Sequence, residues 1–402
     1  MNKKIAVAIA TGAIMFNSLA SSAFAATTLQ ISGNGSDSNN NVNLNLTRSS
    51  SVVQNNVANI TNNVDVDAKT GKNQANDNTG GDVQIDTGSS NVSVSVLNQA
   101  NKNWASLDCC LNNDTDVVIE GNGSDSDNDV DLDLDNSNPI FQDNYAYVDN
   151  DVDVDSDTGD NDADDNTGGD VSIDTGDAKA NVDVFNMLNL NLARIGGGDQ
   201  EEGNGALSLW IKGNGSDSNN DIDADIDSNN SIVQNNDANV NNDLDVDAST
   251  GENDANDNTG GEVEIDTGNA TADVSASTAA NFNWADLSCG CLFDDLLAKI
   301  SENGTDSDND IDLDLSSGKN DGVFQDNYAA VDNDLEDIDA ETGDNDADDN
   351  TGSVEGSDPA IDTGDAKVVA DVANVVNDNA AGLGVELDFG WDLNDLFDML
   401  GL

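Results

Sequence analysis

Two stretches of the chain alternate aspartate with other residues, and this spacing is the first sign of chemistry. One stretch begins at Asp125 and the other at Asp306. In an extended strand alternate side chains share a face, so the carboxylates of each stretch would line one surface. Strands about 4.8 Å apart bring such carboxylates close together, and Ca²⁺ prefers oxygen ligands of this kind. The predicted Ca²⁺ ligands are Asp125, Asp127, Asp129, Asp131, Asp133, Asp306, Asp308, Asp310 and Asp312.

A second interpretation of these aspartates stays open. The run Asp125–Asp129 imitates the start of an EF-hand loop, but Val130 replaces the required glycine and Asn136 the final glutamate. Copy one of the repeat described below carries asparagine at Asn41 and its alternate neighbours, which obligatory ligands would not tolerate. The alternative is therefore a solvated acidic face that keeps the sheet from aggregating.

The four cysteines form two clusters. Each cluster follows a Trp-Ala-x-Leu sequence, and export to an oxidising compartment would favour disulfides. If each copy supplied several coils, the clusters would lie about eight coils apart, too far for a disulfide between them. We expect local pairing or links between subunits. Zinc fits poorly, because the spacing lacks paired CxxC knuckles and the chain has no histidine. The candidate disulfide residues are Cys109, Cys110, Cys289 and Cys291.

A repeated Asp-Thr-Gly triplet resembles the motif of aspartic proteases, but its context favours a turn after a strand. It recurs once per copy, whereas a protease needs two carboxylates in one cleft. The absence of histidine also removes the commonest general base. The sequence therefore predicts no catalytic residues, and an enzyme is the least expected class. The triplets begin at Asp86, Asp174, Asp266 and Asp362.

The first 25 residues predict a secretory signal peptide. Lys3 and Lys4 precede an apolar run, and Ala23–Ala25 forms an A-x-A cleavage site. The run is too short to span a membrane, and no later stretch reaches that length. We therefore expect a secreted, extracellular or cell-surface protein that begins at Ala26, without membrane insertion of the mature chain.

The charge of the chain is extremely acidic. Twelve basic residues stand against 81 acidic ones, so the net charge is −69, and it becomes −71 without the leader. Nucleic acids and anionic lipids need basic partners and are excluded as expected ligands. Cations are the expected counterpart. Aspartate far outnumbers glutamate, which fits turns and short-armed cation ligation better than general salt adaptation.

These residues are positioned by four tandem repeats. The tetrapeptide Asn-Gly-[Ser/Thr]-Asp recurs at spacings of 88, 92 and 89 residues. Copies one and three share one set of motifs, and copies two and four share another, which gives an A-B-A-B order. The tetrapeptides begin at Asn34, Asn122, Asn214 and Asn303. We place the leader at 1–25, the copies at 26–113, 114–205, 206–298 and 299–382, and a C-terminal cap or docking segment at 383–402.

The middle of each copy alternates strictly, as in Ile232–Ala248, which predicts long β-strands. The more apolar face carries glutamine and asparagine at fixed places, such as Gln234 and Asn236. A parallel, in-register stack would join these amides into ladders. We therefore predict an all-β protein with a β-solenoid fold, the alternative being four tandem β-sandwich domains. Short helices are predicted over Leu292–Ile300 and, at the C-terminus, over Trp391–Leu400.

Two family resemblances follow from these motifs. Gln54–Ala58, a Gln-x-Asn-x-Ala sequence, resembles curlin repeats of bacterial amyloid fibres, although the glycine after glutamine is missing and the repeat is longer. The run Thr70–Gly81 resembles Asn/Asp-rich secreted repeat surface proteins of uncultivated bacteria. The first resemblance implies stacked strands with internal amide ladders, and the second implies no assigned activity.

Together these features predict a structural protein of the cell surface or extracellular matrix. We expect self-assembly into a homo-oligomer, a filament or a coat, stabilised by divalent cations. The alternative function is an adhesin or a mineral- or ice-binding surface module. Ice is the weaker choice, because ice-binding faces would use Thr-x-Thr ranks and this chain offers Thr-Gly.

Overall fold

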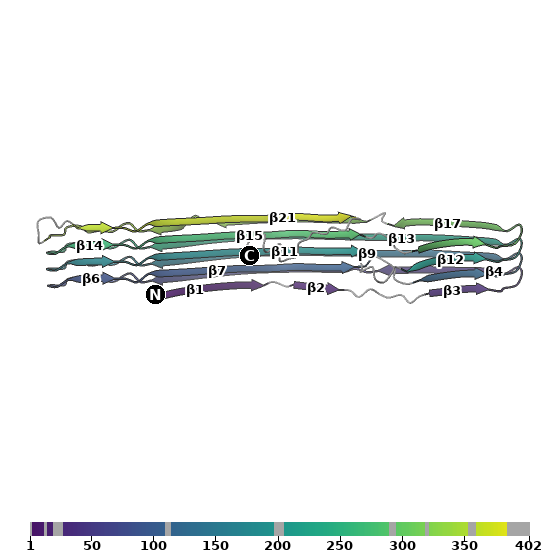
Figure 1. Cartoon of the computed structure of the whole chain (residues 1–402), viewed down its shortest axis with the longest axis horizontal. Helices are drawn as coiled ribbons and strands as arrows, with labels where there is room; N and C mark the ends of the chain where they lie inside the picture. Colours follow the sequence, from purple (N-terminus) through teal and green to yellow (C-terminus); the bar gives the residue numbers. More distant parts are fainter. Residues whose placement is uncertain are drawn as a thin grey trace.

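The computed structural model of the chain describes residues 2–11, 14–18, 27–108, 114–196, 205–288, 295–317, 321–352 and 359–383. All regular secondary structure within these ranges is β-strand. Equivalent strands of successive copies lie side by side in parallel sheets, which run along the long axis of the molecule (Figure 1). The all-β prediction is confirmed for this part of the chain.

The largest sheet has seven strands and contains the long alternating segment of every copy. In copies two and three this segment is one continuous strand of 31 residues. The strands are β4 (Asn39–Ser49), β5 (Val52–Lys69), β9 (Asp127–Asp157), β13 (Asn219–Ser249), β17 (Asp308–Ser317), β18 (Gly322–Asp334) and β19 (Ile338–Glu341).

Three further sheets are built from the shorter strands. A six-stranded sheet contains β1 (Asn2–Thr11), β2 (Ile14–Ser18), β7 (Ser90–Leu107), β11 (Ala178–Gly196), β15 (Ala270–Ser288) and β21 (Ala366–Leu383). A four-stranded sheet contains β3 (Thr27–Ser32), β8 (Thr115–Glu120), β12 (Ala206–Lys212) and β16 (Asp295–Ser301). A second four-stranded sheet contains β6 (Val83–Asp86), β10 (Val171–Asp174), β14 (Val263–Asp266) and β20 (Ala360–Asp362).

Each copy forms one step of the stack, which we call a rung and number one to four along the chain. The register shows this directly: Val42 pairs with Val130, Val130 with Ile222, and Ile222 with Ile311. Successive copies are therefore about one strand spacing apart, about 4.8 Å. The expectation of several coils within each copy is wrong. All strands of one copy together form a single rung, because each of them pairs with the equivalent strand of the next copy.

The core is a thin layer between the seven-stranded sheet and the shorter strands. Alternation places Val130 and Leu132 of β9 inward, where they pack against Val117 and Ile119 of β8. Farther along the rung, Val94 belongs to a second cluster that packs β7 against the end of β9. Each such side chain contributes roughly 1.5–3 kcal/mol by leaving water. Period-two alternation thus both forms the strands and fills the core.

Amide side chains continue this core, as the sequence predicted. Gln142 donates to Gln54 at 2.8 Å, and Gln234 donates to Gln142 at 2.8 Å. Asn144 donates to Asn236 at 3.0 Å, and both side chains are fully buried. Because these buried amides bind the equivalent amides of neighbouring rungs, the free-energy cost of burying them is offset. The predicted amide ladders are confirmed.

The corners of the rungs need glycine because neighbouring backbones approach closely there. A Cβ on Gly159, in the corner after β9, would lie 1.8 Å from the carbonyl oxygen of Gly251 in the next rung. The Asn-Gly-[Ser/Thr]-Asp corner uses aspartate in the left-handed region, with φ of 57° at Asp125 and 56° at Asp217. Both predicted turns are therefore corners of the stack.

Two predicted helices have different outcomes. The helix over Leu292–Ile300 is wrong, because residues from Asp295 form β16, which pairs in parallel with β12. Leu296, Ala298 and Ile300 alternate into the core, and this pairing outweighs the local helical pattern. The helix over Trp391–Leu400 and the predicted C-terminal cap lie outside the described residues. No helix of the described part is long and apolar enough to span a membrane.

The predicted leader lies along the edge of the six-stranded sheet. Both β1 and β2 pair in parallel with β7, from Asn2 opposite Ser90 to Ser18 opposite Ser106. Cleavage after Ala25 stays a prediction. In the uncleaved chain, the leader occupies the edge that β7 would otherwise present.

Candidate functional site

Three parallel ladders of carboxylates cross the part of the seven-stranded sheet formed by the first residues of β9 and β13 and by β17, and we call them the acidic ranks. Each rank takes one aspartate from each of rungs two, three and four, in register. Their side chains point away from the core because the residues between them, such as Val130, are buried. The ranks are Asp129–Asp221–Asp310, Asp131–Asp223–Asp312 and Asp133–Asp225–Asp314.

Partial burial and neighbouring carboxylates disfavour ionisation of several aspartates on this face. The pKa of Asp129 is raised first by partial burial and then by the charges of Asp221 and Asp131. The pKa of Asp221 is raised in the same way, by partial burial and then by Asp310. The strongest case on this face lies outside the three ranks, at Asp247, which is in register with Asp155 and Asp339. Partial burial and then the charges of neighbouring rungs raise its pKa to about 6. The face therefore carries repulsion that protons, salt or cations would relieve.

Rung one interrupts this repulsion with amides. Asn41 donates to Asp129 at 2.8 Å, Asn43 to Asp131 at 2.7 Å and Asn45 to Asp133 at 2.9 Å. The asparagines of copy one are thus hydrogen-bond donors to the ranks. Hydrogen bonding to the carboxylates of rung two therefore accounts for asparagine at positions where copy two has aspartate.

The predicted Ca²⁺ ligands reach the surface together but form no compact cluster. Asp125 and Asp306 lie in corners, while Asp127 and Asp308 are separated by Asn219 of rung three. Among the described residues, no three acidic or cysteine side chains are grouped so that they could hold a metal ion. A specific Ca²⁺ site stays a prediction without support from this geometry. The ranks instead form an extended acidic surface.

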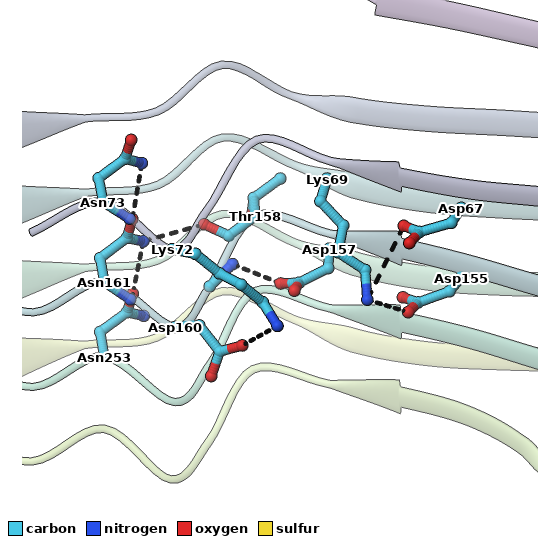
Figure 2. Close-up of polar contacts among 11 residues, drawn as sticks. Asp67, Lys69, Lys72, Asn73, Asp155, Asp157, Thr158, Asp160, Asn161 and Asn253 are labelled. Carbon is cyan, nitrogen blue, oxygen red and sulfur yellow. Dashed lines mark hydrogen bonds and ion pairs between the residues drawn. The ribbon is translucent and has the colours of Figure 1, made fainter.

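Two of the four basic residues of copy one, Lys69 and Lys72, form a clamp on rung two (Figure 2). The Lys69 ammonium lies 2.5 Å from an Asp155 carboxylate oxygen and 3.8 Å from one of Asp67. The Lys72 ammonium lies 3.1 Å from Asp160. The hydrogen bond to Asp155 is the main cause that raises the pKa of Lys69. The clamp neutralises carboxylates at the corner where rungs one and two meet.

Beside the clamp, carboxylates of rungs two and three share hydrogen bonds. Asp157 is buried and accepts the Gly159 N–H at 2.7 Å, and its pKa is raised mainly by burial. The pKa of Glu252 is raised mainly by a hydrogen bond to Asp160. Burial raises the pKa of Asp160, but hydrogen bonds from Glu252 and Lys72 outweigh it and lower that pKa. The carboxylates of this corner are thus held by hydrogen bonds between rungs and by the clamp.

An asparagine ladder runs through the same corner. Asn73 donates to Asn161, and Asn161 to Asn253, each at 2.8 Å (Figure 2). Asn161 and Asn253 also donate to the carbonyl oxygens of Thr158 and Thr250, both at 3.0 Å. Asn161 and Asn253 therefore each hydrogen-bond to a backbone carbonyl of their own corner, and Asn161 also to the asparagine of the next rung.

The other candidate residues have separate positions. The Asp-Thr-Gly aspartates end the strands β6, β10, β14 and β20 and stack in register, and the neighbouring carboxylates add to burial in raising the pKa of Asp174. The cysteines Cys109, Cys110, Cys289 and Cys291 lie outside the described residues.

The strands that lead to the two cysteine clusters are close neighbours. Leu107 of β7 and Leu287 of β15 both pair with Ile195 of β11. The residues that precede the clusters are therefore about two strand spacings apart, roughly 10 Å. The predicted separation of about eight coils is wrong, because each copy is only one rung.

Two functional groups were missed from the sequence. The central members of the ranks, such as Asp221, become visible only when copy three is aligned with copies two and four through the Asn-Gly corners. The Lys69 and Lys72 clamp occurs in copy one alone, so the repeat pattern gave no signal for it.

Comparisons with known proteins add no relative: no protein family, no curated protein and no solved structure matches the chain.

Proposed function

We propose that this chain is a secreted structural protein of the cell surface or extracellular matrix, which assembles into filaments or a coat. In this proposal each molecule is a four-coil β-solenoid. The observation that carries it is the parallel, in-register stack, which within the described part of the chain leaves strand edges at both ends. Rung four presents β16 to β21 on one side, and rung one presents β3 to β6 on the other. Unpaired strand edges are templates for further strands.

The acidic face gives the proposed assembly its dependence on cations. Ranks of carboxylates about one strand spacing apart repel each other, and the repulsion would grow with every added molecule. Divalent cations would reduce it, and their removal would favour dispersed molecules. No compact binding site is required for this role.

Electron microscopy tests the proposal. The chain from Ala26 should form filaments or sheets, more readily in millimolar Ca²⁺ than in EDTA. Dispersed particles of monomer size in both conditions, at concentrations up to those of a cell surface, would contradict it.

A mineral-binding or adhesive surface is the second candidate, and the regular acidic ranks favour it. Ladders of carboxylates at fixed spacing suit calcium minerals. Co-sedimentation with calcium carbonate or phosphate particles distinguishes it from the first: binding by dispersed monomers would favour the surface module.

A further inference from the structure

We propose that rung four of one molecule docks on rung one of a second copy, so that molecules stack head to tail into an open, polar filament. The inference rests on the proposed structural function and names the two surfaces and their orientation. Such a heterologous contact leaves a free surface at each end and therefore continues without limit.

The first support is the geometry of the edges. The edge of β7 already accepts parallel strands, since β1 and β2 pair with it in register. Removal of the predicted leader would open that edge. The strand β21 of rung four has 18 residues, as β7 does, so β21 of a preceding copy matches the vacated edge in length.

The second support is two buried acceptors in rung one that lack donors. The side-chain oxygens of Asn56 and Asn101 are buried and accept no hydrogen bond from any residue that the structure describes. Their equivalents in rung two are satisfied by rung one: Asn144 accepts from Asn56 at 3.1 Å, and Asn189 accepts from Asn101 at 2.9 Å. The missing donors would therefore come from the rung below.

Rung four carries the matching donors. Within the chain the asparagines of these ladders donate toward the next rung, as Asn281 does to Asn377 at 3.0 Å, whereas the glutamine ladder runs the other way, with Gln234 donating to Gln142. Asn377 ends this ladder, and in a head-to-tail contact its amide would meet Asn101 of the next copy. By the same translation, Asn327 and Asn379 would meet Asn56. In these asparagine ladders, two fourth rungs placed together would oppose donors with donors, and two first rungs would oppose acceptors with acceptors. The ladders therefore fix the direction of stacking.

The third support is glycine at both ends of the stack. A Cβ on Gly251 would lie 1.9 Å from the carbonyl oxygen of Gly343, and one on Gly123 would lie 2.3 Å from the Ser36 nitrogen. Gly343 and Gly35 are the end members of these two rows. A Cβ on either meets nothing within 4 Å, and neither residue lies in the left-handed region. The monomer does not require glycine there, whereas a stacked neighbour would.

The fourth support is an uneven distribution of charge. Copy one (26–113) has 7 acidic and 4 basic residues, a net charge of −3, whereas copy four (299–382) has 24 and 3, a net charge of −21. Contact between two fourth rungs would bring the most acidic surfaces together. Head-to-tail contact instead places Asn41 and its neighbours beside the carboxylates of Asp310 and its neighbours, as Asn41 is placed beside Asp129 within the chain.

Two glycine variants test the inference in the chain from Ala26. Gly343→Ala should block the rung-four end, and Gly35→Ala the rung-one end, while both monomers keep the wild-type melting temperature. Each variant alone should stay monomeric by mass photometry. An equimolar mixture should form dimers and nothing larger, because only one compatible pair of ends remains. Val57→Ala, on the outer face of rung one and 69% exposed, is the matched control and should polymerise like wild type.

The outcomes separate this inference from the function on which it rests. If the wild-type chain polymerises and both glycine variants do so equally, assembly uses another surface and only the head-to-tail contact fails. Dimers of either variant alone would show contact between like ends and would also overturn it. If the wild-type chain never polymerises, both the inference and the filament function fail.

Discussion

At the scale of single residues, the same position in a rung is either an amide that holds its neighbour or a carboxylate that repels it. Inside the core the choice is fixed, since Asn144 and Asn236 are buried and hydrogen-bonded. On the outer face it varies, and Asn41 stands where rungs two to four have aspartate. The inner amides therefore determine stability, and the outer positions set the response to pH and salt.

Removal of one inner amide should be costly. Asn236 accepts from Asn144 at 3.0 Å and from Asn191 at 2.8 Å, so Asn236→Ala leaves two buried donors without their acceptor. We expect a loss of at least about 2 kcal/mol in the free energy of unfolding. The exposed Asn239→Ala is the control and should change it by less than about 0.5 kcal/mol. Equal losses in chemical denaturation would contradict the ladder argument.

The raised pKa of Asp247 predicts an unusual dependence of stability on pH. Its pKa is about 6 in the folded chain, against a model-peptide value of 3.8. Between these values the folded state binds more protons than the unfolded state, so stability falls as pH rises from about 4 to about 6. Asp247→Asn should therefore raise the melting temperature at pH 7.5 and have little effect near pH 4. Because the side chain is exposed, we expect a gain of only about 1 kcal/mol or less.

The melting temperature of the wild-type chain should therefore rise when the pH is lowered from 7.5 to 5. A decrease over this change would contradict the account. The Asp247→Asn variant provides the internal comparison, since its pH profile should be flatter over the same range. The other aspartates with raised pKa values, such as Asp129 and Asp221, act in the same direction.

At the scale of elements, alternation in the sequence was sufficient to predict the strands and their ladders but not their partners. The segment Ile232–Ala248 lies within one long strand, β13, as its period of two indicates. A helix was predicted over Leu292–Ile300 because its leucines have a helical spacing. Pairing with β12 stabilises a strand there instead, and the local sequence does not show this pairing. The number of coils per copy could not be predicted from the sequence either, because the residue pattern of one copy does not distinguish a corner between strands from a bulge within one strand.

The corners offer the sharpest test at this scale. Gly159→Ala would place a Cβ against the backbone of Gly251, where no side chain can move aside. We expect the variant to lose the corner and to unfold at a much lower temperature, by more than about 4 kcal/mol in unfolding free energy. Gly88→Ala, with nothing within 4 Å of its Cβ, is the matched control. A stable Gly159→Ala variant would show that the rungs are farther apart than described.

At the scale of the whole molecule, the fold is a balance between ladders that join the rungs and charge that drives them apart. The net charge of −69 is concentrated in copies two to four, and the basic clamp of Lys69 and Lys72 is confined to the first junction. The sequence made the size of the charge plain. The arrangement of these charges into ranks could not be predicted, because it depends on how the copies align with one another in the sheet.

The balance predicts how salt and Ca²⁺ act on melting. The screening length falls from about 10 Å at 0.1 M salt to about 3 Å at 1 M, which is below the spacing of the ranks, so NaCl alone should raise the melting temperature. Ca²⁺ at equal ionic strength should raise it further if ions are held between carboxylates of adjacent rungs. Asp221→Asn interrupts the first rank and should reduce the Ca²⁺ increment while leaving the NaCl increment nearly intact. If Ca²⁺ and NaCl act equally at matched ionic strength, and EDTA has no effect, the ranks are only screened and the predicted role of Ca²⁺ is wrong.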